Sequence, residues 1–283
     1  MASKLYQNEI VIDDTYAVKN RDKLMGMARG YDPSTVDRKI LGFMEPPSAI
    51  PLIPRSEWSD RIKEKDRTES NLSHLLRRAG IPSTDQNGNG YCWAYSTVGC
   101  VQAVRAFNGQ RHIPLNAHSV AATIKRGADQ GGWCGLSARF LMERGVAPMG
   151  TGENQWPEHS RDYSRLEPRC RERMAQFRVT EGWIDLTLAD YDQEMTFDMV
   201  ASCLLANIPC ALDFNWWGHS VMGCDLVEVS RNAFGIRIRN SWTDGWGDKG
   251  FSVLTGSKTI PNGAVALRVT GAVALRVTGA VAA

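Results

Sequence analysis

The chain has 283 residues, a formal net charge of +2, and 43% hydrophobic and 23% charged residues, which is an ordinary globular composition. A charge this close to zero gives no indication of nucleic-acid binding or of an anionic membrane surface as a partner. Residues 1–10 lack the apolar core of a signal peptide, and no apolar run reaches the length of a membrane-spanning helix.

Residues 1–49 are predicted to form an extension that leads away from the main domain. Their apolar side chains can dock on the domain or on a partner, either a second copy of the chain or a virion protein; these side chains are Leu5, Tyr6, Ile10, Val11 and Ile12. The extension ends in a segment with Pro46, Pro47, Pro51 and Pro54, and proline-rich segments act as stiff spacers. We therefore expect an assembly arm rather than a segment that lies in a cleft and inhibits.

The remainder of the chain is predicted to contain helices first and strands afterwards. A charged amphipathic stretch indicates a helix over 59–79, and further helical patterns cover 93–107, 117–127 and 136–144. From residue 181 the pattern changes to short strands separated by turn residues, at 210–214, 221–229 and 235–239.

Residues 257–283 form a tail with an internal repeat. Residues 263–270 recur as 271–278, and residues 279–282 begin a third copy. One copy can be the last strand of the β region. The others can be a duplication, a strand that binds a partner or a cloning artefact, and the sequence leaves these alternatives open.

Cys92 stands at the end of a glycine-rich turn, where the apolar helix predicted over 93–107 begins. A thiol becomes a strong nucleophile only as the thiolate, so its pKa must fall. The unpaired N–H groups and the dipole at a helix N-terminus favour an anion. His219 and Asn240 follow downstream in the order of a base and of a group that orients the base. These three residues therefore predict a site for nucleophilic catalysis.

The motifs around these residues resemble those of the papain family of cysteine peptidases. The resemblance rests on Gln86-Asn87-Gly88-Asn89-Gly90-Tyr91-Cys92-Trp93, on Gly218-His219-Ser220 and on Asn240-Ser241-Trp242 with Trp246, and it covers roughly residues 50–256. It implies an α+β, papain-like fold of two lobes. One lobe would be helical, the other an antiparallel β-barrel-like lobe, and the active site would lie in the cleft between them.

The resemblance also implies roles for further residues. Gln86 and the backbone N–H of Cys92 would hold the oxyanion of the reaction. A glycine pair would hold the backbone of an extended substrate, and the subsite beside it would take an apolar residue at P2, the second residue before the cut bond. The implied substrate-binding residues are Gly131, Gly132, Trp133, Cys134 and Trp242.

Some positions depart from the family pattern. The family's disulfide would join the positions of Asn89 and Asp129, so we expect that bridge to be absent. Tyr91 replaces a small residue before Cys92 and can crowd the cleft. The seven cysteines show no metal-ligand spacing, and we expect no metal or cofactor. The lost bridge and the lack of a signal favour a reducing compartment, the cytoplasm, or a host cytoplasm or virion if a phage encodes the chain.

Two functions follow as hypotheses. The first is a cysteine endopeptidase that hydrolyses a polypeptide substrate through an acyl-enzyme. The second is a structural or binding protein of a phage virion that keeps the papain-like fold without activity, because folds outlive functions. The lack of a signal, of the bridge and of a recognisable inhibitory pattern suggests a phage or bacterial origin. A peptidoglycan amidase is a third and weaker hypothesis, because those enzymes lack the Asn-Ser-Trp block.

Overall fold

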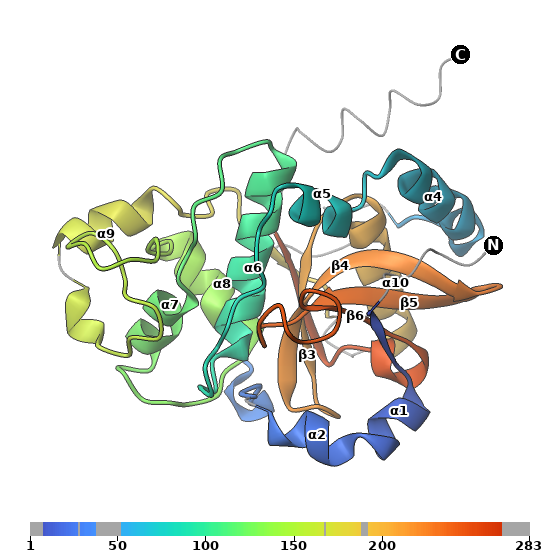
Figure 1. Ribbon diagram of the computed structural model, residues 1–283, viewed down its shortest axis with the longest axis horizontal. Helices are drawn as coiled ribbons and strands as arrows, with labels where there is room; N and C mark the ends of the chain where they lie inside the picture. The colour runs from blue at the N-terminus through green and yellow to red at the C-terminus, as the bar shows by residue number, and fades with distance from the viewer. Residues whose placement is uncertain (1–7, 28, 38–51, 167, 188–191, 268–283) are drawn as a thin grey trace.

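The computed structural model describes residues 8–27, 29–37, 52–166, 168–187 and 192–267. These form a helical lobe and a β lobe that lie side by side (Figure 1). Helix α6 (Cys92–Phe107) packs against strands β3 (Cys210–Phe214) and β4 (His219–Ser230) where the lobes meet. The expected order, a helical lobe followed by a β lobe, is confirmed.

The helical lobe is built around α6. It also contains α7 (Ala117–Ile124), α8 (Cys134–Glu143), the 3-10 turn η2 (Tyr163–Arg165) and α9 (Pro168–Ala175). The helices predicted over 93–107, 117–127 and 136–144 are confirmed, with ends that shift by a few residues. Most of α6 is buried because α5, α7, α8 and the sheet surround it, and this explains its apolar sequence.

The helix predicted over 59–79 is in fact two helices, α4 (Arg55–Thr68) and α5 (Leu72–Arg78). Glu69 adopts a left-handed φ of 51°, and its N–H donates to the Lys65 carbonyl, which ends α4. The chain then turns, so that α4 packs on the β lobe and α5 packs on α6. A continuous amphipathic pattern does not reveal such a break.

The β lobe is one sheet of seven strands in the order β1-β6-β5-β4-β3-β7-β2. The strands not yet given are β1 (Ile10–Ile12), β2 (Trp183–Asp185), β5 (Ala233–Arg239), β6 (Phe251–Leu254) and β7 (Gly263–Leu267). The strands predicted at 210–214, 221–229 and 235–239 lie within β3, β4 and β5. The expected barrel-like lobe is, across the described residues, a sheet that does not close into a barrel, with β1 and β2 at its edges.

Each lobe has its own apolar core, and the sheet separates the two. Ala211 of β3 belongs to the core around α6, whereas Cys210 and Leu212 belong to the core shared with α4 and α10 (Gln193–Leu205). This alternation is expected of a strand whose two faces are both covered. Among the described residues, no helix is both long and apolar enough to cross a bilayer.

The first copy of the C-terminal repeat is part of the sheet. Its residues Gly263–Leu267 form β7, which is fully buried and pairs antiparallel with β3 on one side and β2 on the other. Because β7 is hydrogen-bonded to a strand on each side, this copy of the repeat is an inner strand of the sheet. The copies from residue 271 onward lie outside the described residues.

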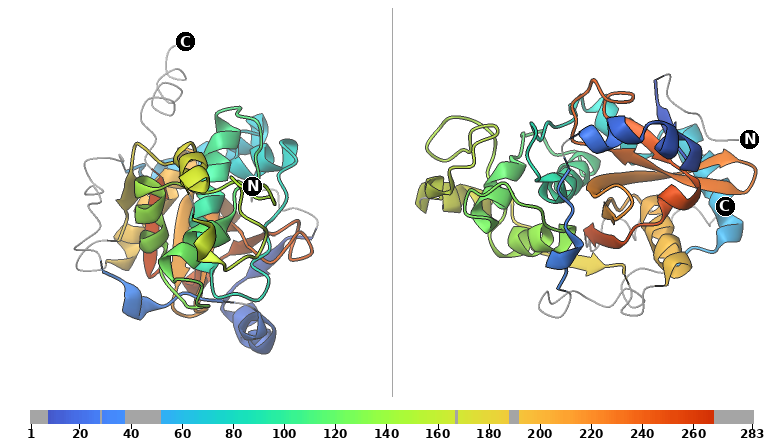
Figure 2. Two further views of the ribbon diagram at one scale, coloured as in Figure 1. Left: turned by 90° about the vertical axis from the view of Figure 1, so that its left-hand side faces the viewer. Right: turned by 90° about the horizontal axis from the view of Figure 1, so that it is seen from below.

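The N-terminal segment packs on the β lobe and then crosses the junction of the lobes. β1 pairs parallel with β6, and α1 (Asp14–Lys19), α2 (Arg21–Gly26) and the turn η1 (Pro33–Thr35) follow. In the right-hand view of Figure 2 this blue segment runs between the green helices and the orange strands. This differs from the expectation of an arm that leads away. Leu5, Tyr6, Pro46, Pro47 and Pro51 lie outside the described residues.

A buried ion pair anchors the start of this segment. Glu9 accepts from the Arg237 guanidinium at 2.7 and 3.1 Å, and the two side chains are 0% and 1% exposed. Asp225 Oδ2 lies 3.5 Å from the same guanidinium. Removing one partner of a buried pair leaves the other desolvated and poorly compensated.

We therefore expect Glu9→Ala to lower the free energy of unfolding by about 3 kcal/mol. Urea unfolding at neutral pH measures this change. Glu64→Ala is the matched control, because the Glu64–Arg67 pair is solvent-exposed and such pairs contribute about 0–1 kcal/mol. Equal, small effects of both substitutions would show that the Glu9 pair does not anchor the segment.

Candidate active site

Cys92 is the first residue of α6 and is completely buried. Its backbone N–H lies at the helix N-terminus, where no partner exists within the helix. The backbone N–H of Ser220, the residue after His219, donates to Cys92 Sγ at 3.3 Å. The junction of α6 with β4 therefore places the Cys92 thiol beside the residue that follows His219.

His219 begins β4, and Asn240 follows the end of β5, so two neighbouring strands place them together. His219 Nε2 lies 2.8 Å from Asn240 Oδ1, which also accepts the N–H of Ser241 at 2.8 Å. The amide oxygen of Asn240 can only accept hydrogen bonds. The imidazole must therefore donate to it, so Nε2 carries the proton. Nδ1, which has no hydrogen-bond partner among the described residues, is then left as the basic nitrogen.

Gln86 is fixed beside this pair by Ser241. The Ser241 hydroxyl donates to Gln86 Oε1 at 2.6 Å, and Gln86 Nε2 donates to the carbonyl of Asn89 at 2.7 Å. A primary amide carries two N–H bonds, and this contact uses one of them. The resemblance assigns the second to the oxyanion of a substrate.

Tryptophans cover the imidazole. The Trp242 ring stacks on His219 with centroids 4.6 Å apart and planes at 25°, and Trp217 meets His219 edge-on at 4.9 Å. Trp242 was predicted among the substrate-binding residues. In this structure its ring lies on the His219 side of the site, where it keeps water from the bond between His219 and Asn240.

The glycine pair forms one wall of a cleft that the N-terminal segment fills. Gly132 N–H donates to the Gly30 carbonyl at 2.9 Å, and Asp32 N–H donates to the Gly132 carbonyl at 2.8 Å. On the opposite wall the N–H groups of Gly30 and Tyr31 approach the Gly218 carbonyl at 3.3 and 3.1 Å. Residues 30–32 therefore lie between Gly132, which the resemblance assigned to the backbone of a substrate, and Gly218.

Proteins of known structure share this arrangement of lobes, although no protein-family model matches the chain. Xylellain, a cysteine protease from Xylella fastidiosa, superposes with a TM-score of 0.56 at 16% identity, covering 86% of this chain and 97% of that one. Digestive procathepsin L 3 of the Tenebrio molitor larval midgut gives a TM-score of 0.56 at 16% identity, over 87% of this chain and 78% of that one. The chain has the papain-like fold.

A curated protein is also similar in sequence. The cysteine endopeptidase RepA of Oryza sativa subsp. japonica is 26% identical over 191 residues. The match covers 59% of this chain and 47% of the rice protein, so the chain spans less than half the length of that relative.

Cys92 and His219 are both held neutral. Burial raises the pKa of Cys92 to about 12, and burial lowers the pKa of His219 to about 3, although its hydrogen bond to Asn240 opposes the shift. The sequence led us to expect a lowered thiol pKa. The difference arises because both groups are fully buried, and desolvation outweighs the effect of the helix N-terminus.

Asn89 and Asp129, at the two positions that the disulfide of the papain family would join, form hydrogen bonds instead. Asp129 Oδ1 accepts the Gly90 N–H at 2.6 Å, and Asn89 Nδ2 donates to the carbonyls of Gln86 and Asn87. All seven cysteines are buried free thiols. Tyr91 does not crowd the cleft: it is buried in the helical lobe, and its hydroxyl donates to the Ala128 carbonyl at 2.8 Å.

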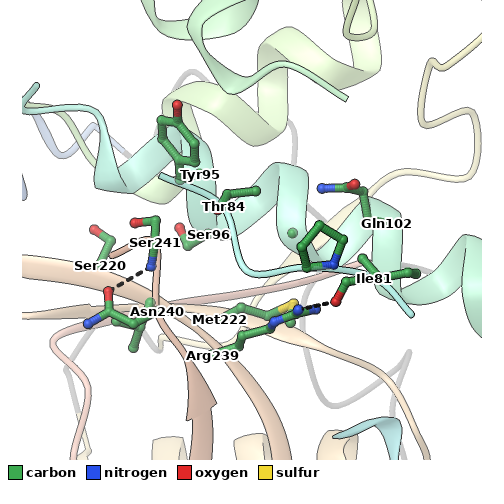
Figure 3. A pocket seen from close by; sticks show the side chains of 13 residues that line it. Ile81, Thr84, Tyr95, Ser96, Gln102, Ser220, Met222, Arg239, Asn240 and Ser241 are labelled. Carbon is green, nitrogen blue, oxygen red and sulfur yellow. Dashed lines mark hydrogen bonds between the residues drawn. The ribbon is translucent and has the colours of Figure 1, made fainter. Parts of the chain in front are cut away.

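A small cavity, separate from the substrate cleft, lies next to Asn240 and Ser241. Figure 3 shows it between α6 and the strand ends, with Ser96, Ser220, Asn240 and Ser241 on the side of the site. Its volume of about 30 Å³ suits one or two water molecules rather than a substrate side chain.

Sequence reasoning missed the residues that close the cleft. The one trace of this contact in the sequence is the glycine at residue 30. In the structure a Cβ at that residue would lie 2.0 Å from the Gly90 carbonyl oxygen, so the contact requires glycine. Arg29 adds a further link: its Nη1 donates to the Trp217 carbonyl at 3.0 Å. Glycine is common wherever a chain turns or runs over a surface, so a lone glycine in an extension could not identify this contact.

Proposed function

We propose that this chain is a cysteine endopeptidase held in a latent state by its own N-terminal segment. Cys92 is the nucleophile, His219 the acid and base, and Asn240 the residue that orients His219. Gln86 and the Cys92 N–H hold the oxyanion. The observation that carries the proposal is the His219–Asn240 hydrogen bond, because it fixes the tautomer that leaves Nδ1 free to take the thiol proton.

The reaction follows from these positions. Cys92 Sγ attacks the scissile carbonyl carbon while His219 Nδ1 takes the thiol proton. The oxyanion accepts from Gln86 and from the N-terminus of α6. The imidazolium then gives its proton to the departing amine, which leaves an acyl-enzyme. Water attacks this thioester with His219 as base, and the carboxylic acid and the thiol are released.

Latency is supported by the contacts of residues 29–32. They use the N–H and carbonyl of Gly132 and the carbonyl of Gly218, which an extended polypeptide would need. Cys92 and His219 are both fully buried, and burial is the main cause of the pKa shift that holds each of them neutral. Catalysis therefore requires that the segment leave the cleft, after which water and substrate can reach the thiol and an ion pair of the two groups becomes favourable.

Modification by a peptidyl epoxide tests the proposal. The full-length chain and a chain with Gly30→Ala are incubated with the epoxide, and the adduct is mapped by mass spectrometry. We expect one adduct per Gly30→Ala chain, on Cys92, slower formation of the same adduct in the unaltered chain, and none after Cys92→Ser. An adduct spread over the other six cysteines, or no adduct on Cys92 in the Gly30→Ala chain, would refute a catalytic thiol.

The same measurement separates the alternative function. A virion protein that keeps only the papain-like fold has no need of a reactive thiol, so it predicts an inert Cys92 even when the cleft is open. The tautomer fixed by Asn240 and the placement of Gln86 favour the enzyme.

A further inference from the structure

One peptide group in the loop before Cys92 is held at both ends by side chains. It joins Asn89 to Gly90. Its carbonyl, that of Asn89, accepts from Gln86 Nε2 at 2.7 Å. Its N–H, that of Gly90, donates to Asp129 Oδ1 at 2.6 Å. The two ends of a single peptide group therefore contact Gln86 and Asp129.

This peptide group couples its two partners because it is planar. The C=O and the N–H of a trans peptide point in opposite directions, so a rotation of the group turns both ends together. Gly90 makes such a rotation easy, because a residue without a Cβ has few forbidden backbone conformations. The bond to Asp129 opposes the rotation, and a carboxylate is a stronger acceptor than a neutral group. The Asn89 carbonyl is thereby kept pointing at the Gln86 amide.

The Asn89 carbonyl is one of two groups that fix the Gln86 amide. The other is Ser241, whose hydroxyl donates to Gln86 Oε1 at 2.6 Å. The Gln86 side chain is completely buried. Because the amide is planar, holding its oxygen and one N–H determines the direction of the second N–H. This second N–H is the one that the resemblance assigns to the oxyanion.

Asp129 reaches the peptide group from another loop of the helical lobe. It lies between α7 and the glycine pair Gly131-Gly132, and it is exposed to solvent. The Tyr91 hydroxyl donates to the Ala128 carbonyl at 2.8 Å and holds the same two loops together. Removal of an exposed side chain leaves no cavity, so we expect the chain to fold, with its loops in contact, without the Asp129 carboxylate. The contribution particular to Asp129 is the orientation of the peptide group.

We propose that Asp129 is a positioning residue for catalysis, which aims the Gln86 amide at the oxyanion through the Asn89–Gly90 peptide group. The proposal rests on the proposed function and adds a residue to it. A donor that is aimed in advance needs no reorganisation when charge develops on the carbonyl oxygen. Without the carboxylate the peptide group can turn, and Gln86 then spends part of its time in orientations that leave the oxyanion poorly stabilised.

A purely structural role of Asp129 predicts something different. If the carboxylate only fastens the loop that carries the glycine pair, its loss displaces the wall that holds a substrate, and KM rises. Loss of an aimed oxyanion donor lowers kcat instead, because that interaction is strongest in the transition state. Alkylation of Cys92 by iodoacetamide forms no oxyanion, so its rate is independent of how Gln86 is oriented.

The test uses full-length chains with Gly30→Ala and a peptide substrate. We expect Asp129→Ala to lower kcat about tenfold, to change KM by less than about threefold and to leave the rate of Cys92 alkylation unchanged. Asp129→Asn keeps an acceptor oxygen and should recover most of kcat. Glu143→Ala is the matched control, because it removes an exposed carboxylate of the same lobe, paired with Arg139, and should leave kcat unchanged.

A double-mutant cycle with Gln86 isolates the coupling. Gln86→Ala alone should lower kcat about a hundredfold, the typical effect of losing one oxyanion donor. If Asp129 acts through Gln86, adding Asp129→Ala lowers kcat no further. Effects that multiply in the double variant, an unchanged kcat after Asp129→Ala, or a rise in KM alone would each overturn the proposal.

Failure of the proposed function has a different signature. No Gly30→Ala chain would then hydrolyse the peptide in a way that depends on Cys92, and the role of Asp129 would fall with it. Hydrolysis that depends on Cys92, together with a kcat that Asp129→Ala leaves unchanged, removes the role of Asp129 alone.

Discussion

Gly30→Ala is expected to open the cleft and to raise the rate of Cys92 alkylation in the native chain about tenfold or more. A Cβ at residue 30 would lie 2.0 Å from the carbonyl oxygen and 2.3 Å from the carbonyl carbon of Gly90. Both are backbone atoms of the loop before Cys92, so neither can turn aside as a side chain would. The collision requires a backbone shift, and we expect it to lift residues 29–32 away from Gly132 and Gly218.

Gly26→Ala is the matched control for this substitution. It lies in the same segment, at the end of α2, and a Cβ there meets nothing within 4 Å. We expect its alkylation rate to equal that of the unaltered chain. If Gly30→Ala and Gly26→Ala alkylate equally slowly, the segment does not guard the thiol.

His219→Ala, introduced into the Gly30→Ala chain, is expected to lower the turnover of a peptide substrate about a thousandfold. The imidazole takes the proton from Cys92 and returns it to the leaving amine, and no other described side chain with a basic nitrogen is held in this position by Asn240. Initial rates of hydrolysis at saturating substrate measure the effect.

His112→Ala serves as the control histidine, because it lies outside the site and should leave turnover unchanged. Retention of more than about a tenth of the turnover after His219→Ala would assign the proton transfer to another group.

Much of the site could be predicted from the sequence because its chemistry needs particular residue types in a particular order. Cys92 before an apolar helix, then His219 and Asn240, indicated the motif. The structure brings these residues together through the contact of α6 with β4 and the pairing of β4 with β5. The strands were predictable because their apolar runs are bounded by turn residues.

The closing of the cleft could not be predicted because it depends on backbone groups. The bonds of residues 30–32 to Gly132 and Gly218 join N–H and carbonyl groups, which nearly every residue possesses. The open sheet likewise depends on β1 and β2, whose three-residue strands carry little pattern.

The most direct test is the hydrolysis of an unfolded polypeptide by full-length chains, followed by mass spectrometry of the products. Four chains are compared: unaltered, Gly30→Ala, Cys92→Ser and the double variant. The account predicts slow cleavage by the unaltered chain, cleavage at least about tenfold faster by Gly30→Ala, and none by either chain that lacks the Cys92 thiol. Cleavage that persists after Cys92→Ser, or a Gly30→Ala chain that cuts nothing, would contradict it.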